Sequence, residues 1–242
     1  GKKKNATIEA IVEIKNNRAL VVLFLLLVPV SCIHQFYFVH TAGFLGTFQS
    51  QTATKINSVF GVGGGGLMTI GQMAEIVVLA FMPLLLPRLS RKTLLAVGLL
   101  AYAGRMALFA YVGDIHAATK IPEVAILMTG VALHGLCFGA FIFVSFVVVD
   151  ELTTKDVRAS AQSLYSLVIF GIGIIVGSKV AGWVADWSTP EAGGMNFTRL
   201  FSVPMWASLG CLVFLLALYP RRAVKTAAPA TAEELAPPEH GS

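Results

Sequence analysis

Polar side chains that could bind a substrate or a proton lie inside stretches that are otherwise almost wholly apolar. Gln72 and Glu75 are three residues apart, so on a helix they share one face. A carboxylate there can accept hydrogen bonds from substrate hydroxyls or carry a proton. Because a charged group costs about 3 kcal/mol at the centre of a membrane helix, it is usually paired or functional. The pair predicts a polar binding site; the structural alternative is an ion pair of Glu75 with Arg105 or Lys179.

A second polar group precedes it in the chain. Ser31 and Gln35 share one helix face, and His34 and Tyr37 share another. Such a cluster must face protein or water, because lipid cannot satisfy its hydrogen bonds. His34 is equally compatible with a packed core residue and with a proton relay. Arg105 is expected to have a carboxylate partner.

A third group combines a histidine with aromatic rings. His134, Phe138, Phe141 and Ser145 follow one another at spacings of four, three and four, which predicts one continuous helical face. Aromatic rings on such a face can stack on a planar ligand, although a packing stripe has the same pattern. The glycines at 135 and 139 would allow a ligand or a helix to approach closely.

These residues lie in six apolar stretches separated by short loops. Each stretch is close to the roughly 20 residues that cross a bilayer. The stretches are Leu20–Val39, Leu67–Leu86, Leu94–Val112, Val124–Val149, Ala159–Val184 and Phe201–Tyr219. Hydrophobic residues make up 56% of the chain and charged residues 13%, against about 25% charged in soluble domains. The sequence predicts an all-α polytopic membrane protein with six transmembrane helices.

Basic residues alternate between the loops. Thirteen of the 18 Lys and Arg residues flank the termini and the even-numbered turns, three lie on the opposite loops, and Arg105 and Lys179 lie within spans. This bias predicts that both termini face the cytoplasm. The positive charge therefore reflects topology, and we expect no nucleic-acid partner. The three cysteines lie in apolar stretches, so neither a disulfide nor a metal site is expected.

The chain divides into three parts. Residues 1–19 are expected to form a cytoplasmic linker or interfacial helix, residues 20–219 the six-helix transmembrane domain, and residues 220–242 a disordered cytoplasmic tail. The first helix should run past Val39 to a break near Gly43, followed by either a mobile flap or a tolerated insertion. Gly63–Gly66 should be a hinge. Gly173, Gly177 and Ala181 predict a ridge for close helix packing.

Four strings resemble the C-terminal half of a major facilitator transporter, and within that superfamily the bacterial nucleoside:proton symporter family. They are Gln-Phe-Tyr-Phe at 35–38, Met-Thr-Ile-Gly-Gln-Met-Ala-Glu-Ile at 68–76, Leu-His-Gly-Leu-Cys-Phe-Gly at 133–139 and Val-Arg-Ala-Ser-Ala-Gln-Ser-Leu at 157–164. The resemblance covers about Ala10 to Tyr219. Phe138-Gly139 stands where family members often have Tyr-Asp, and an Asn expected one turn after Gln35 is absent.

The resemblance implies a nucleoside pocket. Gln35, Gln72 and Glu75 would bind polar groups of the ribose or base, and Phe138, with Phe141, would stack on the base. Glu75 and His34 are the candidates for proton coupling. No catalytic residue, metal or cofactor is expected.

The resemblance also implies an architecture. Such transporters have two six-span halves around a central site, so this chain is expected to be a fragment that lacks the N-terminal half. It would lie in the inner membrane, contact the lipid bilayer and carry a nucleoside with protons by alternating access.

Other functions fit parts of the pattern. The same fold moving a sugar or another polar metabolite would also use a Gln-Glu patch. An integral-membrane enzyme would need a catalytic cluster near an interface, but Asp150, Glu151 and Asp156 have no His or Cys beside them. Thr153 and Asp156 are better explained as a capping box for the fifth span. A scaffold or receptor is disfavoured by the mid-membrane Glu75.

Overall fold

A computed structural model describes residues 5–48, 54–55, 58–59, 63–191, 193–221 and 223. Most of the predicted disordered tail (all of residues 220–242 except 220, 221 and 223) and much of the predicted flap lie outside these residues. Within them every regular element is a helix. The elements are α1 (Ala6–Asn16), α2 (Arg18–Gly46), α4 (Gly63–Leu85), α5 (Arg91–Ala110), α6 (Val112–Thr119), α7 (Glu123–Ala132), α8 (His134–Leu136), η1 (Cys137–Phe143), α9 (Val144–Leu152), α10 (Arg158–Ser166), η2 (Leu167–Ile172), α11 (Gly173–Ser188) and α12 (Phe197–Leu218).

Six helical segments among the described residues are long and apolar enough to cross a membrane. They are Arg18–Gly46, Gly65–Leu85, Arg91–Ala110, Glu123–Leu152, Arg158–Ser188 and Phe197–Leu218. The predicted all-α fold with six spans is confirmed. The fourth and fifth spans are composite, because each contains a π-helical segment, η1 and η2, between α-helical parts.

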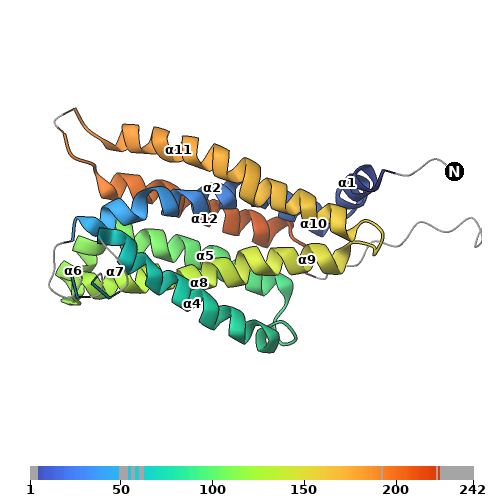
Figure 1. The fold of residues 1–242 in the computed structure, drawn as a ribbon, viewed down its shortest axis with the longest axis horizontal. Coiled ribbons are helices and arrows are strands. Elements are labelled where there is room, and N and C mark those ends of the chain that lie inside the picture. The colour runs from blue at the N-terminus through green and yellow to red at the C-terminus, as the bar shows by residue number, and fades with distance from the viewer. Residues whose placement is uncertain are drawn as a thin grey trace, which may run out of the picture.

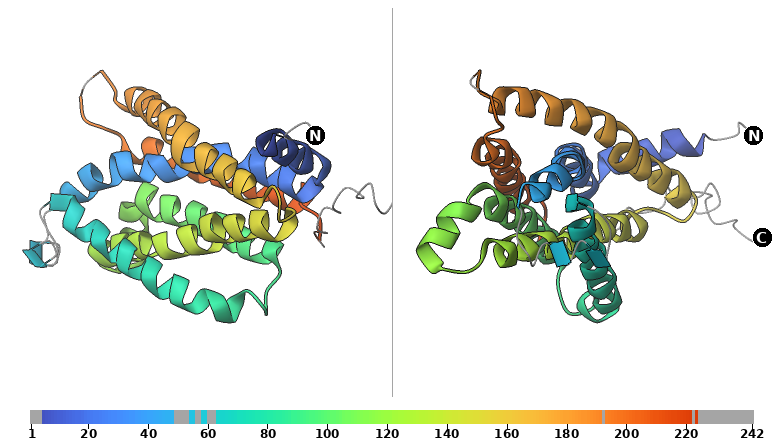
Figure 2. Two further views of the ribbon diagram at one scale, coloured as in Figure 1. Left: turned by 45° about the vertical axis from the view of Figure 1, so that its right-hand side comes forward. Right: turned by 60° about the vertical axis from the view of Figure 1, so that its left-hand side comes forward.

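The helices form an elongated bundle with α2 in its middle. α5 packs against α12, α2 packs against α11, and α4 packs against α2, α7 and α8. Figure 1 shows α11 along one long edge of the bundle and α4 along the other. α1, the α4–α5 turn and the α9–α10 connection lie at one end, and α6 and the α11–α12 connection lie at the opposite end (Figures 1 and 2).

Side-chain caps fix where the spans begin. The Asn17 side chain accepts a hydrogen bond from the Ala19 N–H (3.1 Å) at the start of α2, and Ser90 does the same for α5. Two boundaries differ from the sequence predictions. α2 continues through Gly43 to Gly46, and α4 begins at Gly63, so the glycine run forms its first turn rather than a hinge.

Small residues allow close approach at two helix contacts, as predicted. A Cβ atom on Gly177 of α11 would lie 2.9 Å from Cys32 Cα of α2, and one on Gly135 would lie 2.5 Å from the Ala74 backbone of α4. Such distances leave no room for a larger residue. The glycine ridge on the fifth span therefore packs against the first span, and the fourth span packs through its glycines against α4.

The predicted capping box at the start of the fifth span is wrong. The Thr153 hydroxyl donates to the Val149 carbonyl (2.7 Å) and ends α9, and α10 has no side-chain cap. The next residue, Thr154, donates its N–H and its hydroxyl to the Glu13 carboxylate at 3.0 and 2.5 Å. This contact fastens α1 to the turn between the fourth and fifth spans.

Candidate functional site

Gln72 and Glu75 lie on the part of α4 that the bundle leaves open. Gln72 is exposed, and the Glu75 side chain is 23% exposed. Glu75 Oε2 lies 3.4 Å from Nε2 of His134 on α8, whose imidazole is almost fully buried. The neighbour of Glu75 is therefore a histidine, rather than the Arg105 or Lys179 considered from the sequence.

His134 connects Glu75 to Arg105 of α5. Arg105 Nη1 lies 3.0 Å from His134 Nδ1. Because a guanidinium only donates hydrogen bonds, Nδ1 must accept this one. A neutral imidazole then carries its proton on Nε2, the atom that faces Glu75. Arg105 thus selects the histidine tautomer that directs an N–H toward the carboxylate.

Arg105 itself is fully buried, and the expectation of a carboxylate partner is wrong. Its Cζ lies 3.9 Å above the ring centre of Tyr37 and 5.2 Å from that of Tyr102. Among the described residues its Nε and Nη2 have no hydrogen-bond partner. Histidine and aromatic faces thus stabilise a cation that would otherwise be costly inside a membrane.

His34 of α2 completes this arrangement, which we call the histidine cluster: His34, Tyr37, Tyr102, Arg105 and His134. His34 Nδ1 lies 2.7 Å from the Tyr102 hydroxyl, and its ring stacks on that of His134 with 5.4 Å between centres. The Tyr37 ring also stacks on that of His134, with 5.1 Å between centres. The cluster brings together groups from α2, α5 and α8, with Glu75 of α4 at its edge.

The π-helical segment η1 interrupts the predicted aromatic face of the fourth span. Phe138 is half-buried and its ring centre lies 6.4 Å from that of His34, so it borders the histidine cluster. Phe141 is fully buried and contacts α5, where a Cβ on Gly98 would lie 2.7 Å from Phe141 Cβ. The expectation of one continuous α-helical face is wrong, because a π-helical segment shifts the register of the side chains that follow it.

Gln35 lies on another side of α2 from His34. Its Nε2 donates to the Ser178 hydroxyl of α11 (3.1 Å). The structure therefore brings His34, Glu75 and Phe138 around His134 and places Gln72 beside Glu75, whereas Gln35 and Phe141 face other helices. Sequence reasoning missed Tyr102. The signal was its position three residues before Arg105, which puts both on one helix face.

This arrangement can do two things chemically. The exposed amide of Gln72 and the carboxylate of Glu75 can bind a polar ligand from the open side of α4. Behind them, the His134 Nε2–H can donate to the Glu75 carboxylate, and His34 is a further titratable imidazole within the cluster. All three titratable groups lie within membrane-spanning segments, where such groups are usually functional.

Comparison with known proteins gives a consistent result. A family model described as "Nucleoside H+ symporter" matches residues 2–224. The chain is 28% identical over 147 residues to the putative nucleoside transporter YegT of Escherichia coli, covering 61% of this chain and 31% of that protein. It is 31% identical over 121 residues to the Escherichia coli xanthosine permease, covering 50% of this chain and 28% of that one.

Solved structures show the same fold. The chain superposes on the crystal structure of nucleoside transporter NupG with a TM-score of 0.72 and 23% identity, covering 88% of this chain and 51% of that one. A point mutant of NupG gives a TM-score of 0.74. The aligned region thus spans about half of each solved transporter and less than a third of the two curated relatives.

Proposed function

Starting from the fact that this chain belongs to the nucleoside H+ symporter family, as the match over residues 2–224 establishes, we propose that it forms the C-terminal half of a proton-coupled nucleoside permease. The family consists of transporters, so the membrane-enzyme alternative is set aside. A second six-helix half would complete the protein. The two halves would rock around a central site and open it alternately to each side of the membrane.

The observation that carries this proposal is the position of Glu75. Its side chain is partly exposed on the open side of α4, with Gln72 beside it and His134 behind it. Its carboxylate would accept hydrogen bonds from ribose hydroxyls, and Gln72 would bind other polar groups. Phe138 would stack on the base. Phe141 would support the site from behind, and Gln35, which donates to Ser178 of α11, would lie outside the core of the site.

Proton coupling would use the same carboxylate. Glu75 would accept the coupling proton, and His34, whose ring stacks on that of His134, would be a second candidate to carry it. Arg105 would keep His134 from accepting a proton on Nδ1 while their contact lasts. The substrate and the proton would then be coupled directly, because both would bind to one residue.

The topology follows from the distribution of basic residues. We propose that both termini face the cytoplasm and that the protein lies in the inner membrane. The end of the bundle with α1, the α4–α5 turn and the α9–α10 connection would then be cytoplasmic (Figure 1). The open side of α4 would face the missing half.

The test is uptake of radiolabelled uridine into proteoliposomes that contain the complete transporter, with and without an imposed pH gradient. Glu75→Gln keeps the shape but loses the charge and the proton site, so uptake should fall by more than about tenfold, equivalent to about 1.4 kcal/mol. Lys179→Gln, a charge change at an exposed site on α11, should leave uptake nearly unchanged.

The two roles of Glu75 can be separated. Retained uridine binding with loss of uphill uptake would assign Glu75 to proton coupling, and loss of binding would make it chiefly a ligand. Unchanged uptake in Glu75→Gln under both conditions would refute both roles. Competition by a simple sugar as strong as that by uridine would instead favour a sugar transporter.

A further inference from the structure

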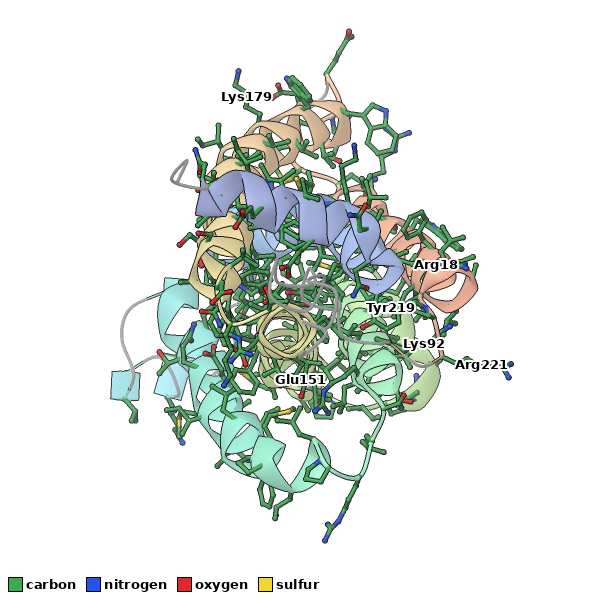
Figure 3. The ribbon with its side chains drawn as sticks, turned by 90° about the vertical axis from the view of Figure 1, so that its right-hand side faces the viewer. Arg18, Lys92, Glu151, Lys179, Tyr219 and Arg221 are labelled. Atoms are coloured by element: carbon green, nitrogen blue, oxygen red, sulfur yellow. The ribbon has the colours of Figure 1, made fainter. Side chains whose placement is uncertain are left out.

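A polar cavity lies far from the histidine cluster, where α5 begins and α9 and α12 end. Its volume is about 110 Å³, room for several water molecules, since one needs about 10–15 Å³ on the same measure. Arg91, Lys92, Glu151, Tyr219 and Arg221 give it a polar lining, and side chains of α9 add an apolar wall. Figure 3 views the molecule from this end.

The charges around the cavity do not cancel. Arg91 and Glu151 form a two-pronged pair, with Nε–Oε2 at 2.9 Å and Nη2–Oε1 at 2.5 Å. Lys92 Nζ donates to the carbonyls of Leu216 and Tyr219 at 2.8 and 2.7 Å, which engages two of its three N–H groups and neutralises none of its charge. Arg221 is exposed. Lys92 and Arg221 therefore leave a positive excess here.

The Tyr219 hydroxyl supplies an unused donor in the same cavity. The side chain is 3% exposed, and among the described residues its oxygen has no hydrogen-bond partner. The pKa of this phenol is raised to about 12, chiefly by burial and also by the nearby Glu151 carboxylate, with Arg91 opposing the shift, so the phenol stays protonated at neutral pH. A buried hydroxyl normally has a partner, and because the described residues supply none to Tyr219, this donor is available to a ligand in the cavity.

The cavity lies just beyond the end of the last span, where a lipid headgroup would be placed. The last span ends at Leu218, one residue before Tyr219, and Arg18 Nε donates to the Leu218 carbonyl (3.1 Å). In Figure 3, Arg18, Lys92 and Tyr219 lie together beside the end of α12, Arg221 extends outward, and Lys179 stands apart on α11. Basic pockets between helix ends on the cytoplasmic side of a membrane suit anionic headgroups.

We propose that this cavity binds the phosphate of an anionic membrane lipid. Lys92 and Arg221 attract the phosphate, the Tyr219 hydroxyl donates to one of its oxygens, and Val148 and Leu152 contact the apolar part of the lipid. Arg91 and Glu151 also line the cavity, and their ion pair neutralises the Glu151 carboxylate, which would otherwise repel a phosphate. The lipid would join α5, α9 and α12 at one end of the bundle. This site is separate from the proposed nucleoside site and does not depend on it.

The test is the thermal unfolding midpoint of the complete transporter in a neutral detergent. The probes are short-chain phosphatidylglycerol, phosphatidylcholine of the same chain length, and inorganic phosphate. A lipid that binds only the native state raises the midpoint with concentration. We expect phosphatidylglycerol to raise it by several degrees and phosphatidylcholine much less.

Two variants remove the proposed contacts without breaking a hydrogen bond seen in the structure. Tyr219→Phe removes an unpartnered hydroxyl and Arg221→Gln an exposed charge, so neither should lower the midpoint without lipid. Both should lose most of the shift given by phosphatidylglycerol. Lys179→Gln, the matched charge control on α11, should keep it.

Three outcomes would overturn the proposal. The first is a wild-type shift retained in both Tyr219→Phe and Arg221→Gln. The second is an equal shift with phosphatidylcholine, which would assign the effect to the acyl chains. The third is the full shift with inorganic phosphate, which would make the cavity a small-anion site instead of a lipid site.

Discussion

The two sides of α2 make contacts of different kinds. Toward α11 the contact is made of small residues: Gly173 and Gly177 meet Ser31 and Cys32 with no space left, and the Ser31 hydroxyl donates to the Ile169 carbonyl. Toward α5 and α8 the contact is the histidine cluster, with a buried cation and two imidazole rings. One side is closely packed and satisfied, and the other holds groups whose hydrogen-bonding capacity is only partly used.

This difference separates what holds the bundle together from what it does. Close packing of small residues is a main source of helix association in a membrane, so the α2–α11 contact should carry stability. A buried guanidinium with two unpartnered nitrogen atoms contributes little stability, because apolar replacements of buried charges are often neutral or stabilising. The histidine cluster is therefore better explained by function than by folding.

The largest effect is expected from Arg105→Met in the complete transporter. Without the guanidinium, His134 is free to take the other tautomer and no longer directs Nε2–H to Glu75. Uridine uptake should fall by more than about tenfold, or about 1.4 kcal/mol. The thermal unfolding midpoint should stay level or rise. If uptake and midpoint fell together, Arg105 would be a structural residue and the contrast between the two sides of α2 would fail.

Two histidine variants sharpen this result. His134→Gln places an amide N–H where Nε2 lies and can still donate to Glu75, whereas His134→Asn offers an acceptor near the Nδ1 position and loses that donor. We expect Gln to retain more uptake than Asn, and the pH profile of uptake to change in Asn. Equal activity and unchanged pH profiles in both would remove His134 from the mechanism.

The sequence predicts the fold, but it predicts the site only in part. Span lengths and the glycine ridge depend on local composition, so the six helices and close packing at the ridge follow from the sequence, whereas the partner of the ridge, α2, does not. The cluster around His134 depends on which helices meet, and no single helix encodes that. Phe141 was placed on the wrong helix face because the pattern at 134–145 assumes an α-helical pitch, and η1 departs from it. Charge pairing predicts a carboxylate partner for Arg105, whereas the folded bundle brings a histidine acceptor, His134, to it.

A smaller effect, on stability alone, is expected from Gly177→Ala. The added methyl would lie 2.9 Å from Cys32 Cα and from Gln35 Cβ, so α2 and α11 would have to separate. Overpacking of this kind costs about 1–3 kcal/mol, and the unfolding midpoint should fall. Gly182→Ala on the same helix, where nothing lies within 4 Å, is the matched control and should not lower it. Equal midpoints in the two variants would mean that the α2–α11 contact does not hold the bundle together.

The smallest effect is expected from Gln35→Leu. This variant tests whether Gln35 belongs to the packed side of α2 or to the side of the histidine cluster. Gln35 adjoins His34 in sequence but donates to Ser178 of α11, so we assign it to the packed side. A side-chain hydrogen bond between membrane helices contributes about 0.6 kcal/mol, so a double-mutant cycle with Ser178→Ala should give a coupling near that value. The KM for uridine should change much less than in Glu75→Gln. A large rise in KM without loss of stability would mean that Gln35 leaves Ser178 to bind the substrate, and the proposed site would then extend around α2 to the α11 side.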